Sequence, residues 1–180
     1  LLVASGIFAV VSFIGVSSTF AVVDANRKAR AISIVMSNLD FALEEMVRSI
    51  RTGSDYHCGD ESAVLLTAPQ DCSGGDSTFA FHETRTNATW VYRLVPHPSG
   101  EAGAWQLQKS KNAGVDFSDV TAPDLVVSNL TFYVTGTHPG DVEQPQVFMV
   151  LDGFVEPVGQ PEFRADFTLQ STIVQRVLDL

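Results

Sequence analysis

Two cysteines are the residues whose type and spacing most directly predict covalent chemistry. Cys58 and Cys72 lie fourteen positions apart in a stretch rich in glycine and proline. A disulfide between them would close a loop of about 15 residues, stabilise the fold by roughly 3 kcal/mol in the chain-entropy model, and indicate an oxidising compartment. The alternative is two unrelated free thiols. The spacing excludes a CxxC redox pair, and two cysteines are too few for a four-cysteine zinc site.

Acidic side chains crowd around the cysteines and could offer oxygen ligands to calcium. They are Asp55, Asp60, Glu61, Asp71 and Asp76. They lack EF-hand spacing, so a solvated acidic loop is the favoured interpretation. The histidines show no HExxH pattern, and the chain has neither a GxSxG elbow nor a phosphate-binding glycine loop. We therefore expect no catalytic residues, no bound metal and no cofactor.

The charge of the chain argues against nucleic acid as a partner. Eleven Lys and Arg against 21 Asp and Glu leave a net charge of −10, whereas phosphate binding needs clustered cations. The charge is also unevenly distributed. Residues 24–51 carry five basic and four acidic side chains, and residues 52–180 carry six basic and seventeen acidic ones. An acidic outer domain would stay soluble, and the domains of two copies would repel each other except at specific contacts.

The first 23 residues contain no charged side chain. As an α-helix they would be about 35 Å long, enough to cross a hydrocarbon core of about 30 Å. This predicts a membrane anchor or the helix of a filament core. A signal peptide cut after Ala25 is a second interpretation, although an h-region is normally about 7–15 residues. A buried globular segment is a third. The side chains predicted to line the membrane or filament core are Leu1, Leu2, Val3, Ile7, Phe8, Val11, Phe13, Ile14 and Phe20.

A second helical pattern follows the apolar run without a break, because no Gly or Pro occurs between Val16 and Thr52. Apolar residues there recur in steps of four and three, which marks one face of a helix. They are Ile32, Met36, Leu39, Leu43, Met46 and Ile50. We expect one helix over about residues 1–51, ending before Gly53, with an apolar first half and an amphipathic second half. This gives three parts: 1–23, 24–52 and a β-rich domain over 53–180.

Short alternating runs predict strands in the last part. They are 63–67, 77–82, 89–95, 104–109, 125–135, 146–155 and 163–176. In the last of these, apolar residues from Phe163 to Ile173 alternate with polar ones, so one face would lie on a core and the other in water. Short connections favour antiparallel pairing. The predicted fold is α+β, with the amphipathic half-helix packed on one face of an antiparallel sheet.

The sequence resembles the type IV pilin and pseudopilin superfamily. The opening LLVASGIFAVVSFIGV is similar to the pilin N-terminus just after its FTLIE start, and residues 38–53 resemble the end of the pilin helix. Residues 129–151 and 163–180 are similar to the closing strands of J-type minor pseudopilins and related proteins. The leader, the first Phe and the family's glutamate would precede Leu1. The resemblance implies a pilin-like fold.

The resemblance also implies a function. A prepilin peptidase in the bacterial inner membrane removes a leader, the new N-terminus is methylated, and subunits stack into an extracellular filament around their apolar helices. The expected partners are copies of this chain or other pilins and pseudopilins. A minor pseudopilin of a type II secretion system is the nearest alternative, and a membrane-anchored or secreted β-rich binding module is an alternative of another class. The basic residues after the apolar run would place that end in the cytoplasm under the positive-inside rule. We give this less weight, because residues preceding Leu1 also count.

Overall fold

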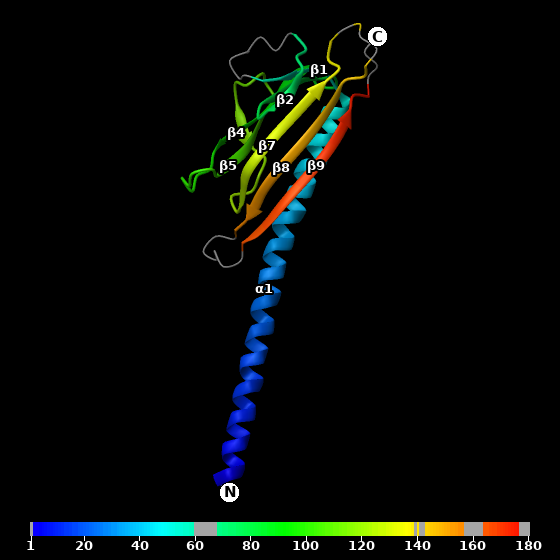
Figure 1. Cartoon of the computed structure of the whole chain (residues 1–180). Helices are drawn as coiled ribbons and strands as arrows, with labels where there is room; N and C mark the ends of the chain where they lie inside the picture. The colour runs from blue at the N-terminus through cyan, green and yellow to red at the C-terminus, as the bar shows by residue number, and fades with distance from the viewer. Residues whose placement is uncertain (1, 60–67, 139, 141–142, 157–163, 177–180) are drawn as a thin grey trace. The chain divides into compact units, whose positions relative to one another are not determined.

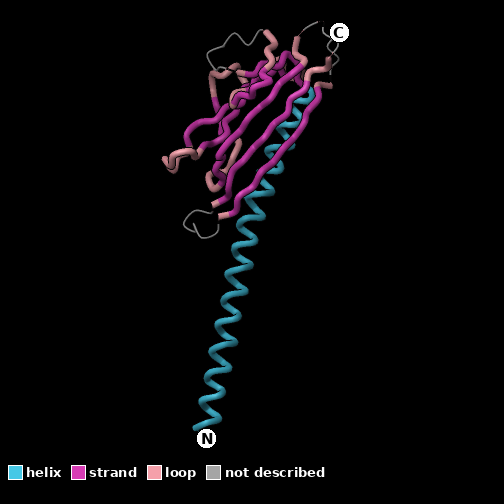
Figure 2. Tube along the Cα trace, viewed as in Figure 1, coloured by secondary structure: helices cyan, strands magenta, loops and turns pink. Residues whose placement is uncertain are grey.

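In the computed structural model, the described part of the chain consists of one long helix followed by β-strands (Figures 1 and 2). The structure describes residues 2–59, 68–138, 140, 143–156 and 164–176. Helix α1 spans Leu2–Thr52, 51 residues, close to the predicted range. The chain divides into two compact units, Leu1–Ile34 and Val35–Leu180, so the boundary falls inside α1. We call the second one the globular unit.

The pairs between the described strands of the globular unit are antiparallel, so the predicted α+β class is confirmed. The strands are β1 (Gly53–Cys58), β2 (Cys72–Asp76), β3 (Phe79–Glu83), β4 (Ala88–Pro96), β5 (Trp105–Ser110), β6 (Phe117–Asp119), β7 (Leu125–Thr135), β8 (Gln146–Val155) and β9 (Ala165–Val174). They form one sheet in the order β1-β3-β4-β5-β7-β8-β9. Strand β2 pairs with β7, and β6 pairs with β5.

The sheet divides into two halves, and the described strands β5 and β7 join them at one paired position. Strands β1, β3, β4, β5 and β6 form the first half, and β2, β7, β8 and β9 form the second. Only Trp105 of β5 and Val127 of β7 are paired between β5 and β7. The second half is the more regular one, because β8 and β9 stay in register over ten consecutive pairs from Gln146↔Val174 to Val155↔Ala165. Side-chain packing and a covalent bond must therefore help to hold the halves together.

The end of α1 packs on one face of this sheet, as Figure 1 shows for the globular unit. Leu39, Met46 and Ile50 are buried in the core, and Met36 and Leu43 are partly buried against it. Two further helix residues, Val35 and Val47, join this core, although the sequence pattern had not included them. Ile32 lies in the first compact unit and is partly exposed. The helix face that carries the packing therefore begins at Val35 within the described core.

Aromatic rings fill the centre of the core and link the two halves of the sheet. Phe79 of β3 stacks on Phe132 of β7, with ring centroids 5.2 Å apart. Tyr56 meets the same Phe79 edge-on at 5.6 Å, and Phe81 lies beside it at 5.7 Å. Such pairs add about 0.5–1.5 kcal/mol beyond their buried area. The position of this cluster explains how the halves hold together where their backbones diverge.

The predicted strands agree with the structure where the alternation is clear. The ranges of β7 and β8 are as predicted. Strand β9 covers 165–174, inside the predicted 163–176, and its partly buried or buried residues alternate with exposed ones. Strands β3, β4 and β5 differ from the prediction by one or two residues at their ends. The prediction had no strand at β1, β2 or β6. The predicted strand at 63–67 lies outside the described residues.

Candidate functional site

The apolar residues of the first compact unit form a continuous exposed surface on α1. The side chains predicted to line a membrane or filament core are between 61% and 77% exposed: Val3, Ile7, Phe8, Val11, Phe13, Ile14 and Phe20. Leu1 and the side chain of Leu2 lie outside the described part. By length and composition, α1 contains a segment that can cross a membrane, and none of that window is buried within the chain. We call the seven described side chains the apolar helix surface.

Three polar side chains along this helix form hydrogen bonds with the helix backbone itself. The hydroxyls of Ser17 and Thr19 donate to the carbonyls of Phe13 and Gly15, each at 2.9 Å. The Asn26 amide donates to the carbonyl of Val22 at 2.9 Å. Hydrogen bonds of this i to i−4 kind remove donors that would be costly to bury in an apolar medium. These polar groups therefore do not oppose burial of the helix.

The last turn of α1 is held by the rest of the globular unit. Three carbonyls without partners inside the helix accept hydrogen bonds from outside it: from the Tyr56 hydroxyl to Ile50 (2.7 Å), from the Arg176 N–H to Arg51 (2.8 Å) and from the Thr84 hydroxyl to Thr52 (2.8 Å). Carbonyls at a helix end must find such partners. Burial raises the pKa of Tyr56, so its hydroxyl stays protonated and remains a donor. The helix end is thus fixed by three separate segments.

An ion pair fixes α1 against the first half of the sheet. Lys109 of β5 donates to both carboxylate oxygens of Glu45, each at 2.8 Å, and its side chain is only 14% exposed. Lys111 lies 3.8 Å from the same carboxylate and 4.6 Å from the centre of the Trp90 ring. Burial, with a smaller effect from the Glu45 charge, raises the pKa of Tyr92. These contacts hold the helix by charge as well as by apolar packing.

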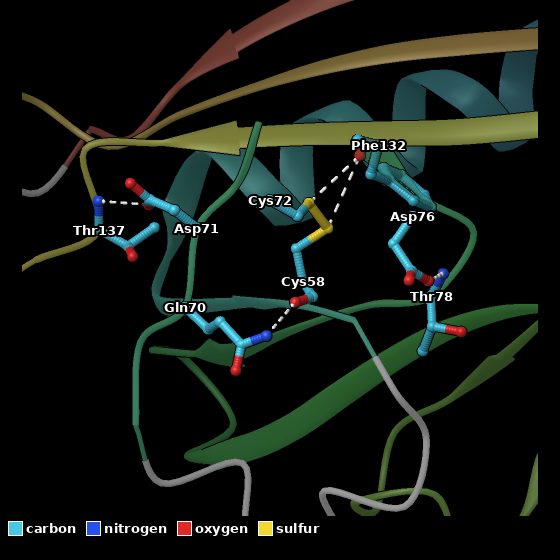
Figure 3. The surroundings of a disulfide bond; sticks show 8 residues. All are labelled: Cys58, Gln70, Asp71, Cys72, Asp76, Thr78, Phe132 and Thr137. Carbon is cyan, nitrogen blue, oxygen red and sulfur yellow. Dashed lines mark hydrogen bonds between the residues drawn. A yellow bond between two sulfur atoms is a disulfide. The ribbon is translucent and has the colours of Figure 1, made fainter. Parts of the chain in front are cut away.

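Cys58 and Cys72 form a disulfide with Cα atoms 5.6 Å apart (Figure 3). Cys58 ends β1 in the first half of the sheet, and Cys72 begins β2 in the second half. Both sulfurs lie against the Phe132 carbonyl oxygen of β7, at 3.6 Å and 3.3 Å. Cys58 is completely buried. The bond therefore joins the two halves of the sheet at a place where no strand pairing links β1 to β2.

Hydrogen bonds support the disulfide on both sides, as Figure 3 shows. Gln70 donates its side-chain amide to the Cys58 carbonyl at 3.0 Å, and its own carbonyl accepts from the Cys58 N–H at 3.1 Å. The Asp71 carboxylate accepts from the N–H groups of Gly136 and Thr137, at 3.3 Å and 3.0 Å. These bonds hold the segment before Cys72 against the end of β7. The residues around the disulfide therefore have a structural role, since they hold β1, β2 and β7 together.

The acidic residues near the cysteines do not form a metal site in the described part of the chain. The Asp76 carboxylate accepts from the Thr78 N–H at 2.9 Å, and Asp55 accepts from the Ser54 hydroxyl. Among the residues that the structure describes, no three His, Cys, Asp or Glu side chains gather closely enough to hold a metal ion. Asp60 and Glu61 lie outside that part. The Asp71 and Asp76 carboxylates order loops instead.

Among the described carboxylates, Glu83 is the one whose pKa is shifted. Its side chain is 4% exposed. Burial by itself raises the pKa of Glu83, but hydrogen bonds from the Thr86 hydroxyl (2.6 Å) and N–H (2.7 Å), together with the Arg85 charge at 3.8 Å, lower it below its usual value. The group closes the turn between β3 and β4. This role is structural, and the sequence pattern gave no sign of it.

No protein family, curated protein or solved structure matches the chain in the comparisons. The structure itself provides a long helix, apolar at its start, whose last part is packed on an antiparallel sheet. That arrangement is compatible with a pilin-like fold.

Proposed function

We propose that this chain is a structural subunit that assembles into a filament through the apolar helix surface, as type IV pilins and related proteins do. The observation that carries the proposal is a helix segment that is free of charge, apolar on all sides and exposed. Burial of a large apolar side chain contributes about 1.5–3 kcal/mol, so seven of them contribute roughly 10–20 kcal/mol. A surface of this kind does not remain in water.

Two environments can cover such a helix. One is the hydrocarbon of a membrane, and the other is a bundle of identical helices from other copies. Small residues such as Gly6 and Gly15 favour close approach of helices, and no other part of the chain contacts the position that a Cβ would take at either glycine. A subunit can therefore move from lipid into a helical bundle while its apolar surface stays out of water. Contacts that repeat with a rotation that does not close produce a filament.

The proposal places the subunit in the bacterial inner membrane before assembly and in an extracellular filament afterwards. The disulfide supports the second location, because such bonds persist outside the reducing cytosol. The globular unit would lie on the outside of the filament, and its excess of acidic side chains would keep it hydrated. A minor pseudopilin would use the same helix, so the number of copies per filament separates these two roles.

The test replaces one residue of the apolar helix surface by a charge in the full-length chain. Phe8→Asp, at a side chain that is 74% exposed, should abolish filaments seen by electron microscopy, because the buried charge has no partner. Phe8→Leu keeps the surface apolar and should assemble. Val115→Asp introduces the same charge at an equally exposed apolar residue of the globular unit and should also assemble.

Two results would contradict the proposal. Normal filaments from Phe8→Asp would exclude the helix as the assembly element. A wild-type chain that stays monomeric in membranes, with no filaments in cells, would favour the binding module. Mass spectrometry of the N-terminal peptide adds a third check, since a methylated residue shortly before Leu1 is expected and a start near Asn26 would indicate a removed signal peptide.

A further inference from the structure

Cations of the globular unit gather around the last turns of α1. Three adjoining shallow depressions there share Arg48, and hydroxyl side chains such as Ser49 and Thr52 lie between the charges. The cations that line these depressions, which we call the basic end, are Arg48, Arg51, Arg85, Lys111 and Arg176. They are five of the eight Lys and Arg between residues 35 and 180. Such clustering is unexpected on a part of the chain with a large acidic excess.

The charges of the basic end are only partly neutralised. The carboxylates that line the same depressions are Glu44, Glu45 and Glu83, which leaves a net charge of +2. Glu45 is already paired with Lys109 at 2.8 Å. Arg51 and Arg176 have no ion pair with any described residue, although the Arg176 N–H bonds to the Arg51 carbonyl and keeps the two close. The C-terminal end of the helix dipole contributes about half a negative charge, which is less than the net positive charge of the basic end.

Acidic side chains gather at the other end of β7, β8 and β9. Asp124 precedes β7 and Glu156 follows β8, and the Glu156 N–H bonds to the Asp124 carbonyl at 2.9 Å. Asp152 lies near the end of β8, and Asp166 of β9 pairs with Phe154 nearby. We call these four carboxylates the acidic end. Arg164, bonded to Asp166 at 3.1 Å, is the cation placed beside them in the described chain, so the net charge is −3.

The two ends are separated by the length of the strands. Strand β9 begins at the acidic end with Ala165 and leads to Arg176 at the basic end, while β8 runs in the opposite direction (Figure 1). Ten residues of strand cover about 33 Å. This is several times the screening length of about 8 Å at physiological salt, so the two ends do not neutralise each other within one copy. Among the described residues, each end therefore keeps an excess of one charge.

We propose that the basic end of one copy docks on the acidic end of a second copy of this chain. The two surfaces carry opposite charges of similar size and belong to the same molecule, which is the complementarity that a head-to-tail contact requires. The contact joins different surfaces of two copies, so it repeats without closing. It rests on the proposed filament function and adds to the helix contacts a polar contact that sets the axial order of the globular units.

The test reverses charge at each end of the full-length chain. One variant combines Arg51→Glu with Arg176→Glu, and a second combines Asp124→Lys with Glu156→Lys. Each should reduce the yield of filaments at least tenfold, because two ends of equal charge then meet. A mixture of the two variants should assemble, and a chain that carries all four substitutions should assemble by itself. Arg51→Lys with Arg176→Lys keeps the charge and serves as the matched control.

Zero-length carbodiimide cross-linking gives a second measurement. A mixture of unlabelled and 15N-labelled full-length chains should yield cross-linked peptides that join Lys111 of one copy to Asp124 or Glu156 of the other. The Lys control variant should add cross-links from positions 51 and 176. Salt at about 0.5 M should reduce these products several-fold, because it shortens the screening length. The cross-links can be measured in detergent, so they do not depend on complete filaments.

The outcomes separate the two proposals. If wild-type filaments form but the reversed ends assemble normally, or if mixing does not restore assembly, the head-to-tail contact is wrong while the filament function stands. If no filaments form, the filament proposal fails, and the absence of cross-links between ends would overturn the contact as well. If the basic end instead binds anionic phospholipid vesicles and gives no cross-links between copies, its partner is a membrane and our assignment is wrong.

Discussion

Removal of the disulfide is the perturbation whose effect follows most directly from the structure. We consider the double substitution of Cys58 and Cys72 by Ala, and reduction of the wild-type chain by dithiothreitol. The bond spans a loop of 15 residues, and the chain-entropy model assigns such a loop about 3 kcal/mol. With a urea dependence of about 2 kcal/mol per molar, the midpoint of unfolding should fall by roughly 1.5 M.

The structure gives a reason for a loss at least this large. Strand β2 is paired with β7 only at Cys72↔Val134 and Asp76↔Phe132. Without the bond, β2 would rely on these pairs and on the hydrogen bonds of Asp71. The end of β1 would also lose its covalent link to the second half of the sheet. The loss should therefore combine a more flexible unfolded chain with weaker contact between the halves.

Tryptophan fluorescence can follow this unfolding in the full-length chain in mild detergent. Trp90 is buried and Trp105 is exposed, and both lie in the globular unit, while residues 1–34 contain no Trp. The signal therefore reports the globular unit and not the apolar helix. The unfolded chain should also expose more surface once the loop is open, which raises the slope of the transition.

The Cys58→Ala and Cys72→Ala chain is its own control, because dithiothreitol should not change its midpoint. A loss below about 1 kcal/mol in both the reduced and the substituted chains would refute the reasoning, since the entropy of a 15-residue loop alone predicts about three times as much. A loss caused by reduction but not by substitution would mean that the thiols, and not the missing bond, disturb the core.

Three further predictions concern the packing of α1 and the turn beside it. Ile50→Ala should lower the free energy of unfolding by about 2–5 kcal/mol in the same assay, because Ile50 is completely buried at the helix end. Gly53→Ala should cost about 1–3 kcal/mol, since a Cβ there would collide with the Phe81 ring, whereas Gly74→Ala meets no neighbour and serves as the control. Glu83→Gln should cost about 1–3 kcal/mol at pH 7, because it removes charged hydrogen bonds. The pKa of Glu83 is lowered in the fold, so its contribution is present above its unfolded pKa and disappears as the pH falls through the folded pKa; a difference from Gln that stays constant down to pH 2 would contradict this.

The regular part of the fold could be predicted because its strands are half buried. In β9, Phe167, Leu169 and Ile173 alternate with polar residues. This period of two indicates a strand with one face on the core and the other in water. The strands that were missed carry no such pattern. Strand β2 reads CSGGD, with two glycines that have low strand propensity. Strand β1 contains Asp55 with a positive φ of 53° and a shift in register. Their positions depend on the disulfide and on neighbouring strands.

The candidate site likewise has a part that the sequence predicts and a part that it does not. The apolar helix surface could be predicted, because it depends on consecutive residues and on helix length alone. The stripe on the second half of α1 was predicted with its residues Leu39, Met46 and Ile50, but the sequence gave no reason to prefer Val35 to Ile32. The basic end could not be predicted at all. Arg51, Arg85 and Arg176 are far apart in the sequence, and only the strand order brings them together.

The position of the disulfide has a consequence for a subunit joined at both ends. Arg85 and Lys111 of the basic end belong to the first half of the sheet, whereas the acidic end belongs to the second half. A force between neighbouring copies would therefore pass in part from one half to the other, where Trp105↔Val127 is the described pair that joins β5 to β7. Hydrogen-bonded contacts open under load one pair at a time, while a covalent bond does not. The bond between β1 and β2 lies on this path. Reduction should therefore make filaments break under a smaller force, in addition to lowering the stability of the globular unit.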